Sequence, residues 1–202
     1  MSLIDDKQAI YDEQTFKNGE YAKAELRSKE FNGCSFVRCS FNEAVLQACI
    51  FRHCQFKDCD MSLIRVKDSL FVGTKFEDCK MAGVNWAEAR WTQAGLLDPS
   101  VHFTGCSINY STFIGVSLKK ATLTKCVAHD VDFSEANLTG ANCTYTDFSE
   151  SRFSQTNLTG ADFTRASNYA INVHQNKIKG AKFSLPEAMA LLYGLDIILV
   201  EK

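Results

Sequence analysis

The sequence carries a large apolar side chain at every fifth position over most of its length. The series that starts at Tyr11 ends at Trp91, and all 17 of its positions are apolar or aromatic. After a slip of two residues, the series resumes at Phe103 and continues to Phe183. All 15 phenylalanines and both tryptophans fall on it. Five residues is the period of neither an α-helix nor a β-strand, so the backbone must follow a path that repeats with each pentad.

The residue two places before each large side chain is usually small. Eight of the nine cysteines occupy this position: Cys34, Cys39, Cys49, Cys54, Cys59, Cys79, Cys106 and Cys126. The ninth lies on the series itself, where the departures from a large apolar residue are Ala128, Cys143 and Asn168. One large and one small inward residue per pentad indicates a chain that turns a corner in each unit. Short polar residues, as in ANLTG and TNLTG, can bond to the turn backbone between them.

If four pentads close a square, each coil takes four pentads and successive coils stack at the spacing of β-strands, about 4.8 Å. Like residues do recur at this interval. The three ladders are Phe16, Phe36, Phe56 and Phe76; Leu118, Leu138, Leu158 and Ile178; and Cys39, Cys59 and Cys79. A repeat protein buries its core by such stacking. We therefore predict an all-β solenoid of about eight coils, in two segments at residues 11–91 and 103–183.

The interval between the segments, residues 92–102, breaks the register of the series. Trp91 and Phe103 are separated by two pentads and two further residues, where two pentads alone would keep the register. Gly95 and Pro99 within the interval favour a turn. One interpretation is a bulge that relieves packing beside the tryptophans. The other is a projecting contact loop that presents Leu96, Leu97 and Asp98 to a partner.

The two ends differ. Residues 1–10 form a lead-in without a clear cap, whereas residues 184–202 leave the pentad series. Ser184 and Glu187 have the spacing of a capping box, which predicts a helix that Gly194 would end. This helix and the β-prone run after it would cover the open edge of the last coil. The same segment could also pair with its twin in a homodimer through Leu191, Leu192, Leu195, Ile197, Ile198 and Val200.

Few residues suggest catalysis or metal binding. Cys49, Cys54 and Cys59 are five residues apart, whereas zinc sites usually bring cysteines closer. Stacked thiols such as Cys39 and Cys59 would lie close enough for a disulfide, but their side chains should run parallel. We interpret the cysteines as small core residues. The four histidines are scattered, and no phosphate-loop, nucleophile-elbow or zinc-protease motif occurs. We therefore expect no enzyme activity, no cofactor and no metal.

The net charge of −2 gives no general attraction to nucleic acid or to an anionic membrane. The first residues show no basic region followed by an apolar core, and no apolar run approaches a membrane span, so we expect a soluble cytoplasmic protein. The charge is nevertheless uneven. The acidic residues of the stretch 131–166 are Asp132, Glu135, Asp147, Glu150 and Asp162. They form either an ordinary solvated surface or an acidic face that meets a basic protein groove.

The tandem pattern A-(D/N)-(L/F)-(S/T)-x over roughly residues 11–183 resembles the pentapeptide-repeat proteins. The stretches CSFNEAVLQACIFRHCQFKDCDMSLI, FEDCKMAGVNW and FSLPEAMALLYGLDI are similar to the Qnr and AlbG group within that family, and most similar to AlbG. This resemblance implies a right-handed, quadrilateral parallel β-helix with a C-terminal capping helix that dimerises. It also implies a DNA-mimic protein that binds DNA gyrase or topoisomerase IV and gives resistance or immunity to quinolone-type or albicidin-type poisons. The repeat alone supports a weaker alternative, a structural rod that binds another protein.

Overall fold

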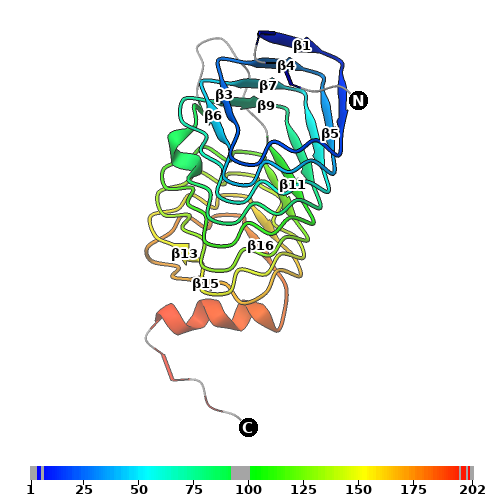
Figure 1. The fold of residues 1–202 in the computed structure, drawn as a ribbon. Helices are drawn as coiled ribbons and strands as arrows, with labels where there is room; N and C mark the ends of the chain where they lie inside the picture. The colour runs from blue at the N-terminus through cyan, green and yellow to red at the C-terminus, as the bar shows by residue number, and fades with distance from the viewer. Residues whose placement is uncertain (1–3, 6, 92–100, 196, 199, 201–202) are drawn as a thin grey trace.

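The chain winds into a right-handed, four-sided parallel β-helix of about eight coils, as the sequence predicts (Figure 1). The computed structural model describes residues 4–5, 7–91, 101–195, 197–198 and 200. One helix lies across the C-terminal end of the stack, and the N-terminal segment lies at the opposite end (Figure 1). Each pentad contributes one short side of a square, and the four stacked sides form four walls, which we name A to D in chain order.

Wall A carries the longest ladder. Its central residues run from Phe16 to Phe183, and its sheet has the order β12-β11-β10-β8-β5-β2, followed further along by the pair β14-β16. The strands are β2 (Thr15–Lys17), β5 (Ser35–Val37), β8 (Gln55–Lys57), β10 (Lys75–Glu77), β11 (His102–Thr104), β12 (Thr122–Thr124), β14 (Asp162–Phe163) and β16 (Lys182–Phe183).

The other walls are built in the same way. Wall D holds the sheet β1 (Ile10–Asp12), β4 (Glu30–Asn32), β7 (Ile50–Arg52) and β9 (Leu70–Val72). Wall C holds the pairs β3 (Glu25–Arg27) with β6 (Val45–Gln47) and β13 (Arg152–Phe153) with β15 (Ala170–Ile171). It also contains a short 3-10 helix, η1 (Trp86–Glu88). Wall B is joined by isolated parallel bridges such as Ser40↔Asp60 and Asp60↔Lys80.

The interior consists of stacked aromatic rings. Along wall A the rings of Phe16 and Phe36 are parallel, with centroids 4.9 Å apart, and those of Phe36 and Phe56 are 4.5 Å apart. Rings from neighbouring walls meet edge to face instead, as Phe36 and Phe41 do at 5.6 Å. Each of these four side chains is essentially inaccessible to solvent. Full burial of one such side chain stabilises the folded state by about 1.5–3 kcal/mol, so the pentad series is the main source of stability.

The small inward residues hydrogen-bond the preceding coil. The thiol of Cys34 lies 3.3 Å from the carbonyl oxygen of Tyr11, and the hydroxyl of Ser69 donates to Leu46 at 2.6 Å. All nine cysteines are buried and unpaired, which confirms that they are core residues. Burial raises the pKa of both the Cys54 and the Cys126 thiol to about 12, because the thiolate would lose its hydration. These two thiols are therefore held protonated.

The corners require a left-handed backbone conformation, which occurs two residues after most of the large side chains. Asn18 and Gly33 adopt φ angles of 51° and 61° there. The ladder supports this strain, since the N–H of Asn18 donates to the carbonyl of Val37 on the next coil at 2.9 Å. In later coils, a carboxylate or amide oxygen stabilises the turn, as Asn157 does by accepting from the N–H of Thr159 at 3.1 Å. The predicted role of the short polar residues is thus confirmed.

The interruption lengthens one coil. Phe76 pairs with Phe103 on wall A, whereas the earlier wall A pairs, such as Phe56 with Phe76, are separated by four regular pentads. After Trp91 on wall D, the next wall is already wall A, so this coil holds seven residues more than a regular one. The prediction that two pentads between Trp91 and the next large side chain would keep the register is therefore wrong.

The last coil departs from the predicted series at two positions. The sequence places Asn168 and Val173 inside, but Asn168 is exposed with a φ of 57°, and Val173 is only partly buried. Tyr169 and Ile171 are buried in their place, and Ile171 pairs with Phe153 two positions earlier than a regular coil would allow. The reason is the polar amide of Asn168, which would lose its hydrogen bonds in an aromatic core.

Both ends of the stack are covered. Near the N-terminus, the ammonium of Lys29 donates to the carbonyls of Asp5 and Gln8 at 2.9 and 2.6 Å, which holds the lead-in against the first coils. At the other end, the helix η2 (Glu187–Leu195), a 3-10 helix, packs on β15 (Figure 1). The predicted capping box is wrong in detail, because the Ser184 hydroxyl accepts from the N–H of Arg165 at 2.8 Å and so caps the last coil.

Candidate protein-interaction surface

The outward residues of each pentad flank the large side chain and occupy the corner after it. The predicted acidic residues take both kinds of position. Asp132, Asp147 and Asp162 lie next to the central residues of walls C, B and A, whereas Glu135 and Glu150 occupy the corners after walls C and B. The structure therefore distributes the five carboxylates over three walls, and it does not bring them together on one flat face.

Asp147 is the most strongly bound of these carboxylates. It lies 2.9 Å from the ring Nε2 of His129, and it accepts from the amide of Asn168 at 2.9 Å and from the hydroxyl of Ser149 at 2.7 Å. Partial burial opposes its ionisation, but these hydrogen bonds outweigh burial and lower the pKa of Asp147 below its ordinary value. Asp147 is therefore a structural anion, already satisfied by its own chain.

Asp162 and Asp132 also serve the turns. Asp162 accepts from the N–H of Thr164 at 2.9 Å and pairs with the ammonium of Lys182 at 3.4 Å. Hydrogen bonding to Thr164, with a smaller contribution from Lys182, lowers the pKa of Asp162. Asp132 accepts from the N–H of Ser134 at 2.9 Å. These contacts leave less of each carboxylate for a partner.

The carboxylates at two of the corners, in contrast, make no side-chain contacts of this kind among the residues that the structure describes. Glu135 and Glu150 are exposed, and within the described chain no hydrogen bond or ion pair holds either side chain. Asp130, at the corner one coil before Glu150, is also exposed and has no side-chain partner among the described residues. Asp130 and Glu150 are thus the acidic groups on this edge that are available to a ligand.

The remaining predictions concern the interruption and the C-terminal tail. Leu96, Leu97 and Asp98 lie outside the described residues. In the tail, Leu191 packs against the core and Leu192 is half-buried, so both serve the cap. The exposed members of the predicted dimer interface are Leu195 at 37%, Ile197 at 52%, Ile198 at 91% and Val200 at 85%.

Three further exposed apolar residues of the C-terminal segment were not predicted from the sequence. Leu185, which precedes the helix η2, and Met189 and Tyr193 within it are all exposed. Each is visible in the sequence as an apolar residue outside the set predicted for the dimer interface, and this is the signal that could have indicated them.

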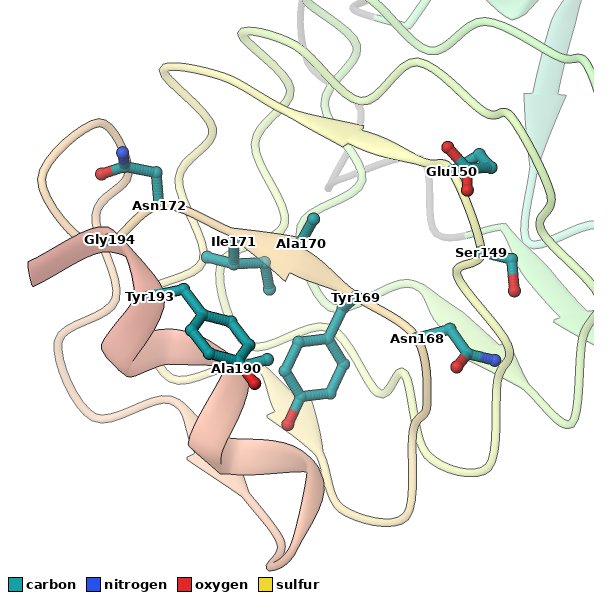
Figure 2. Close-up of a pocket in the computed structure, with 10 residues that line it drawn as sticks. All are labelled: Ser149, Glu150, Asn168, Tyr169, Ala170, Ile171, Asn172, Ala190, Tyr193 and Gly194. Atoms are coloured by element: carbon teal, nitrogen blue, oxygen red, sulfur yellow. The ribbon is translucent and has the colours of Figure 1, made fainter. Parts of the chain in front are cut away.

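The sequence also did not predict a cavity of about 630 Å³. It lies between the helix η2, the strand β15 and the corner that carries Glu150 (Figure 2). In Figure 2, Tyr193 and Ala190 lie on one side and Ser149 and Glu150 on the other, with β15 between them. The pentad pattern does not predict this cavity, because the cavity forms where the helix η2 crosses the last coil.

Within the described part of the chain, no group of three or more His, Cys, Asp or Glu residues is placed to hold a metal ion. Among the same residues, no helix has the length and apolar character needed to cross a lipid bilayer. The described surface is therefore one of corners, ladders and shallow cavities.

Two sequence families match the chain. The family described as a pentapeptide repeat region matches residues 29–113, and the one described as pentapeptide repeats (8 copies) matches residues 132–167. Together they span more than half of the chain. A search of curated protein sequences found no significant match.

Solved structures share the fold. A trypsin-treated variant of QnrB1, a plasmid-mediated fluoroquinolone resistance protein, is 23% identical, with a TM-score of 0.65 over 98% of this chain and 96% of that one. Full-length QnrB1 is 18% identical, with a TM-score of 0.54 over 93% and 100%. HetL, a protein of the cyanobacterium Nostoc involved in heterocyst differentiation regulation, is 16% identical, with a TM-score of 0.51 over 85% and 84%. At these identities the likeness concerns the fold, and the similarity to AlbG stays a prediction.

Proposed function

Because this chain belongs to the pentapeptide-repeat proteins, we propose that it binds DNA gyrase or topoisomerase IV without catalysing a reaction of its own. In this proposal, it protects the topoisomerase from a poison of the quinolone or albicidin type. The observation that carries the proposal is the likeness to QnrB1 over 98% of the chain, which includes the covered ends as well as the coils.

The physical argument is one of shape and charge. About eight coils at strand spacing make a rod of roughly 40 Å, and every outward side chain stands on a wall or a corner of it. Carboxylates on three walls would favour a basic protein groove that normally holds duplex DNA. Among the acidic groups along the corner after wall B, Asp130 and Glu150 have no side-chain partner within the described chain. We therefore assign the main contact to the edge formed by this corner.

The interruption and the tail have proposed roles as well. The seven residues beyond a regular coil support the interpretation of residues 92–102 as a contact loop, with Leu96, Leu97 and Asp98 as its contact residues. The exposed apolar residues at the C-terminus support a homodimer, in which two rods would meet end to end.

The experiment is a supercoiling assay with purified gyrase and the full-length protein. We expect the protein to restore supercoiling in the presence of ciprofloxacin or albicidin, and to slow supercoiling at higher concentration when no drug is present. If the protein shows no rescue and no inhibition at micromolar concentration, the proposal is contradicted. Charge removal at Asp130 and Glu150 together should raise the concentration needed for rescue.

A second candidate is a scaffold rod that binds a different protein partner. The likeness to HetL favours it, since that protein has the same fold and is described as acting in differentiation. A pull-down with the immobilised protein separates the two. Recovery of a gyrase or topoisomerase IV subunit supports the first proposal, and recovery of another protein without either subunit supports the second.

A further inference from the structure

The charged residues of the second segment are sorted by wall. Between residues 101 and 184, walls A and D and the corners after them carry one acidic residue, Asp162, and a set of basic residues. The basic residues are Lys119, Lys120, Lys125, Arg165, Lys177, Lys179 and Lys182. Walls B and C and their corners carry Arg152 and the acids Asp130, Asp132, Glu135, Asp147 and Glu150. The net charge of −2 therefore conceals a strongly basic side of the rod. We name walls A and D of this segment, with their corners, the basic face.

The basic side chains are accessible to a ligand, since every one of them is exposed. Lys182 pairs with Asp162 at 3.4 Å, and the guanidinium carbon of Arg165 lies 5.4 Å from the centroid of the Tyr145 ring. Other lysines of the face have no hydrogen bond or ion pair within the described chain. These are Lys120, Lys125, Lys177 and Lys179. Their ammonium groups are satisfied by solvent alone, so they are the groups that an anionic ligand can engage.

The lysines of wall D lie at the two ends of an uncharged patch. Ser117, Asn137, Asn157 and Lys177 pair in register along this wall, so the first and the last of these coils are about 14 Å apart at strand spacing. The two coils between them present asparagine, threonine and glycine outwards. A methyl group at the corner residue Gly160 would meet no atom within 4 Å. The patch between the lysines is therefore open, and a rigid ligand can approach it closely.

This patch offers hydrogen-bond donors. The side-chain oxygens of Asn137 and Asn157 each accept from the N–H two residues later, in both cases at 3.1 Å. Their amide NH₂ groups have no partner within the described chain. Lysine ammonium, asparagine amide and threonine hydroxyl groups all contact the phosphate oxygens of DNA in protein complexes. The one large apolar side chain exposed on the described part of the basic face is that of Tyr145, whereas a lipid surface is bound through a broad apolar face.

The basic face lies diagonally opposite the edge that we assign to the topoisomerase. Walls D and A meet at the corner after wall D, whereas Asp130 and Glu150 occupy the corner after wall B. These two corners are opposite each other in a square coil. The proposed homodimer uses the C-terminal end of the stack, so it leaves the side walls exposed. A polyanion can therefore lie on the basic face while the acidic edge contacts the enzyme.

We propose that the basic face binds the phosphate backbone of duplex DNA without reading its sequence. The separation of about 14 Å between the two ends of the patch is close to the width of the major groove, about 12 Å, so lysines at both ends reach phosphates of both strands. The choice of DNA over an acidic protein or a second rod rests on the proposed function, because the polyanion that a topoisomerase holds is DNA.

The test measures the binding of fluorescein-labelled duplex DNA to the full-length protein by fluorescence anisotropy, with no gyrase present. Two duplexes of unrelated sequence should bind with equal affinity. The logarithm of the association constant should fall linearly with the logarithm of the salt concentration, with a slope of about −4 if each of the unpaired lysines displaces one counterion. No binding at about 50 mM salt, or an affinity independent of salt, would overturn the inference.

A pair of substitutions locates the contact. Lys177→Ala combined with Lys179→Ala should reduce the steepness of the salt slope by about two and weaken binding about tenfold or more at about 50 mM salt. The matched control combines Lys67→Ala with Lys80→Ala, which removes two exposed lysines from walls C and B. The control should change the affinity by less than about twofold, because these lysines lie off the basic face. Equal losses in the two variants would show a general effect of net charge and overturn the inference.

Other occupants of the face give different outcomes. If polyglutamate with the same number of charges binds as tightly as the duplex, the face suits an acidic protein and the assignment to DNA is overturned. If the protein alone forms assemblies larger than a dimer at low salt, and the Lys177 and Lys179 variant does not, the face binds a second copy and the assignment is likewise overturned. Light scattering measures these masses.

The supercoiling assay separates this inference from the proposed function. If the protein rescues gyrase from the drug but does not bind DNA through Lys177 and Lys179, the basic face fails and the function stands. If it binds DNA through these lysines but gives no rescue, the basic face stands and the topoisomerase assignment fails. Rescue is the deciding readout, because DNA held on the basic face would by itself slow supercoiling. Unchanged thermal unfolding of both double variants, altered at exposed positions, confirms that each remains folded.

Discussion

At the scale of single residues, the inward small position is occupied by thiols in the first coils and by hydroxyls in several later ones. Both types donate to a carbonyl of the preceding coil. The Cys59 thiol lies 3.4 Å from the carbonyl of Phe36, and the Thr156 hydroxyl donates to Phe133 at 2.9 Å. The cysteines therefore act as small hydrogen-bond donors, and their number reflects the repeat more than any redox chemistry.

This role predicts losses of stability of different size for two substitutions of Cys59. Cys59→Ser should change the free energy of unfolding by no more than about 1 kcal/mol, because a hydroxyl can make the same bond. Cys59→Leu should cost about 1–3 kcal/mol through overpacking, since neighbouring coils leave no room for the longer side chain. Urea denaturation followed by circular dichroism measures both. A serine variant less stable than the leucine variant would refute the assignment.

The hydrogen-bonded Asp147 predicts a dependence of stability on pH. Its pKa in the folded state lies below the ordinary value of 3.8, so its contribution to stability is complete above that pH and is lost only as the pH falls through the lower pKa of the folded state. Asp147→Asn should therefore lower stability at pH 7, and this loss should shrink progressively as the pH falls from 3.8 towards the depressed pKa of the folded state. The control is Asp132→Asn, which keeps the turn bond to Ser134. Urea midpoints at a series of pH values test this, and parallel pH curves for the Asp147 variant and the unaltered protein would contradict it.

At the scale of elements, most of the β-helix can be predicted from the sequence because each pentad lies in the same environment as the next. The ladders of Phe16 and Leu118 follow directly from the spacing of four pentads, since stacked coils place like residues in contact. Prediction failed where this equivalence ends. Tyr169 replaces Asn168 in the last coil, and Ser184 caps a coil and not the helix. Both residues face an end of the stack, where there is no following regular coil to dictate their contacts.

The candidate site was predictable only in part for the same reason. Sequence reasoning found Glu150 because acidic residues are dense around it, but it could not group Glu150 with Tyr193. These residues are far apart in the sequence, and they line one cavity only because the helix η2 crosses β15. No periodicity in the chain encodes that crossing. Asp132, Asp147 and Asp162 likewise fall on three walls, because three pentads separate each from the next and advance the chain by three sides of a square.

The exposed C-terminal residues predict the oligomeric state. Ile198 is 91% exposed, and burial of such side chains between two copies would stabilise a homodimer. Ile198→Glu should convert the protein to a monomer, because the dimer would bury an unpaired charge. Light scattering after size-exclusion chromatography measures the mass. The control is Ile10→Glu, which alters a side chain 53% exposed at the opposite end and should leave the mass unchanged. A monomeric unaltered protein would contradict the prediction.

At the scale of the whole molecule, each coil contacts only the coils before and after it. Such a rod should tolerate the removal of one complete coil, because the newly joined coils present the same side chains to each other. Deletion of residues 37–56 removes four pentads and brings Phe36 against Phe76 and Phe31 against Phe71, which are ring pairs of the kind that stack now. The coil that contains the interruption accommodates seven residues more than a regular one, but a deletion offers no chain to absorb a mismatch.

We therefore expect the variant lacking residues 37–56 to keep the circular dichroism spectrum of the β-helix and to be shorter by about 4.8 Å in small-angle scattering. A variant lacking residues 37–54 loses less chain, but it displaces the pentad phase by two residues and turns Phe56 and the large side chains after it out of the core. It should unfold at a much lower temperature or fail to fold. If this shorter deletion proved as stable as the deletion of one whole coil, the square coil would not be the unit that stabilises this protein.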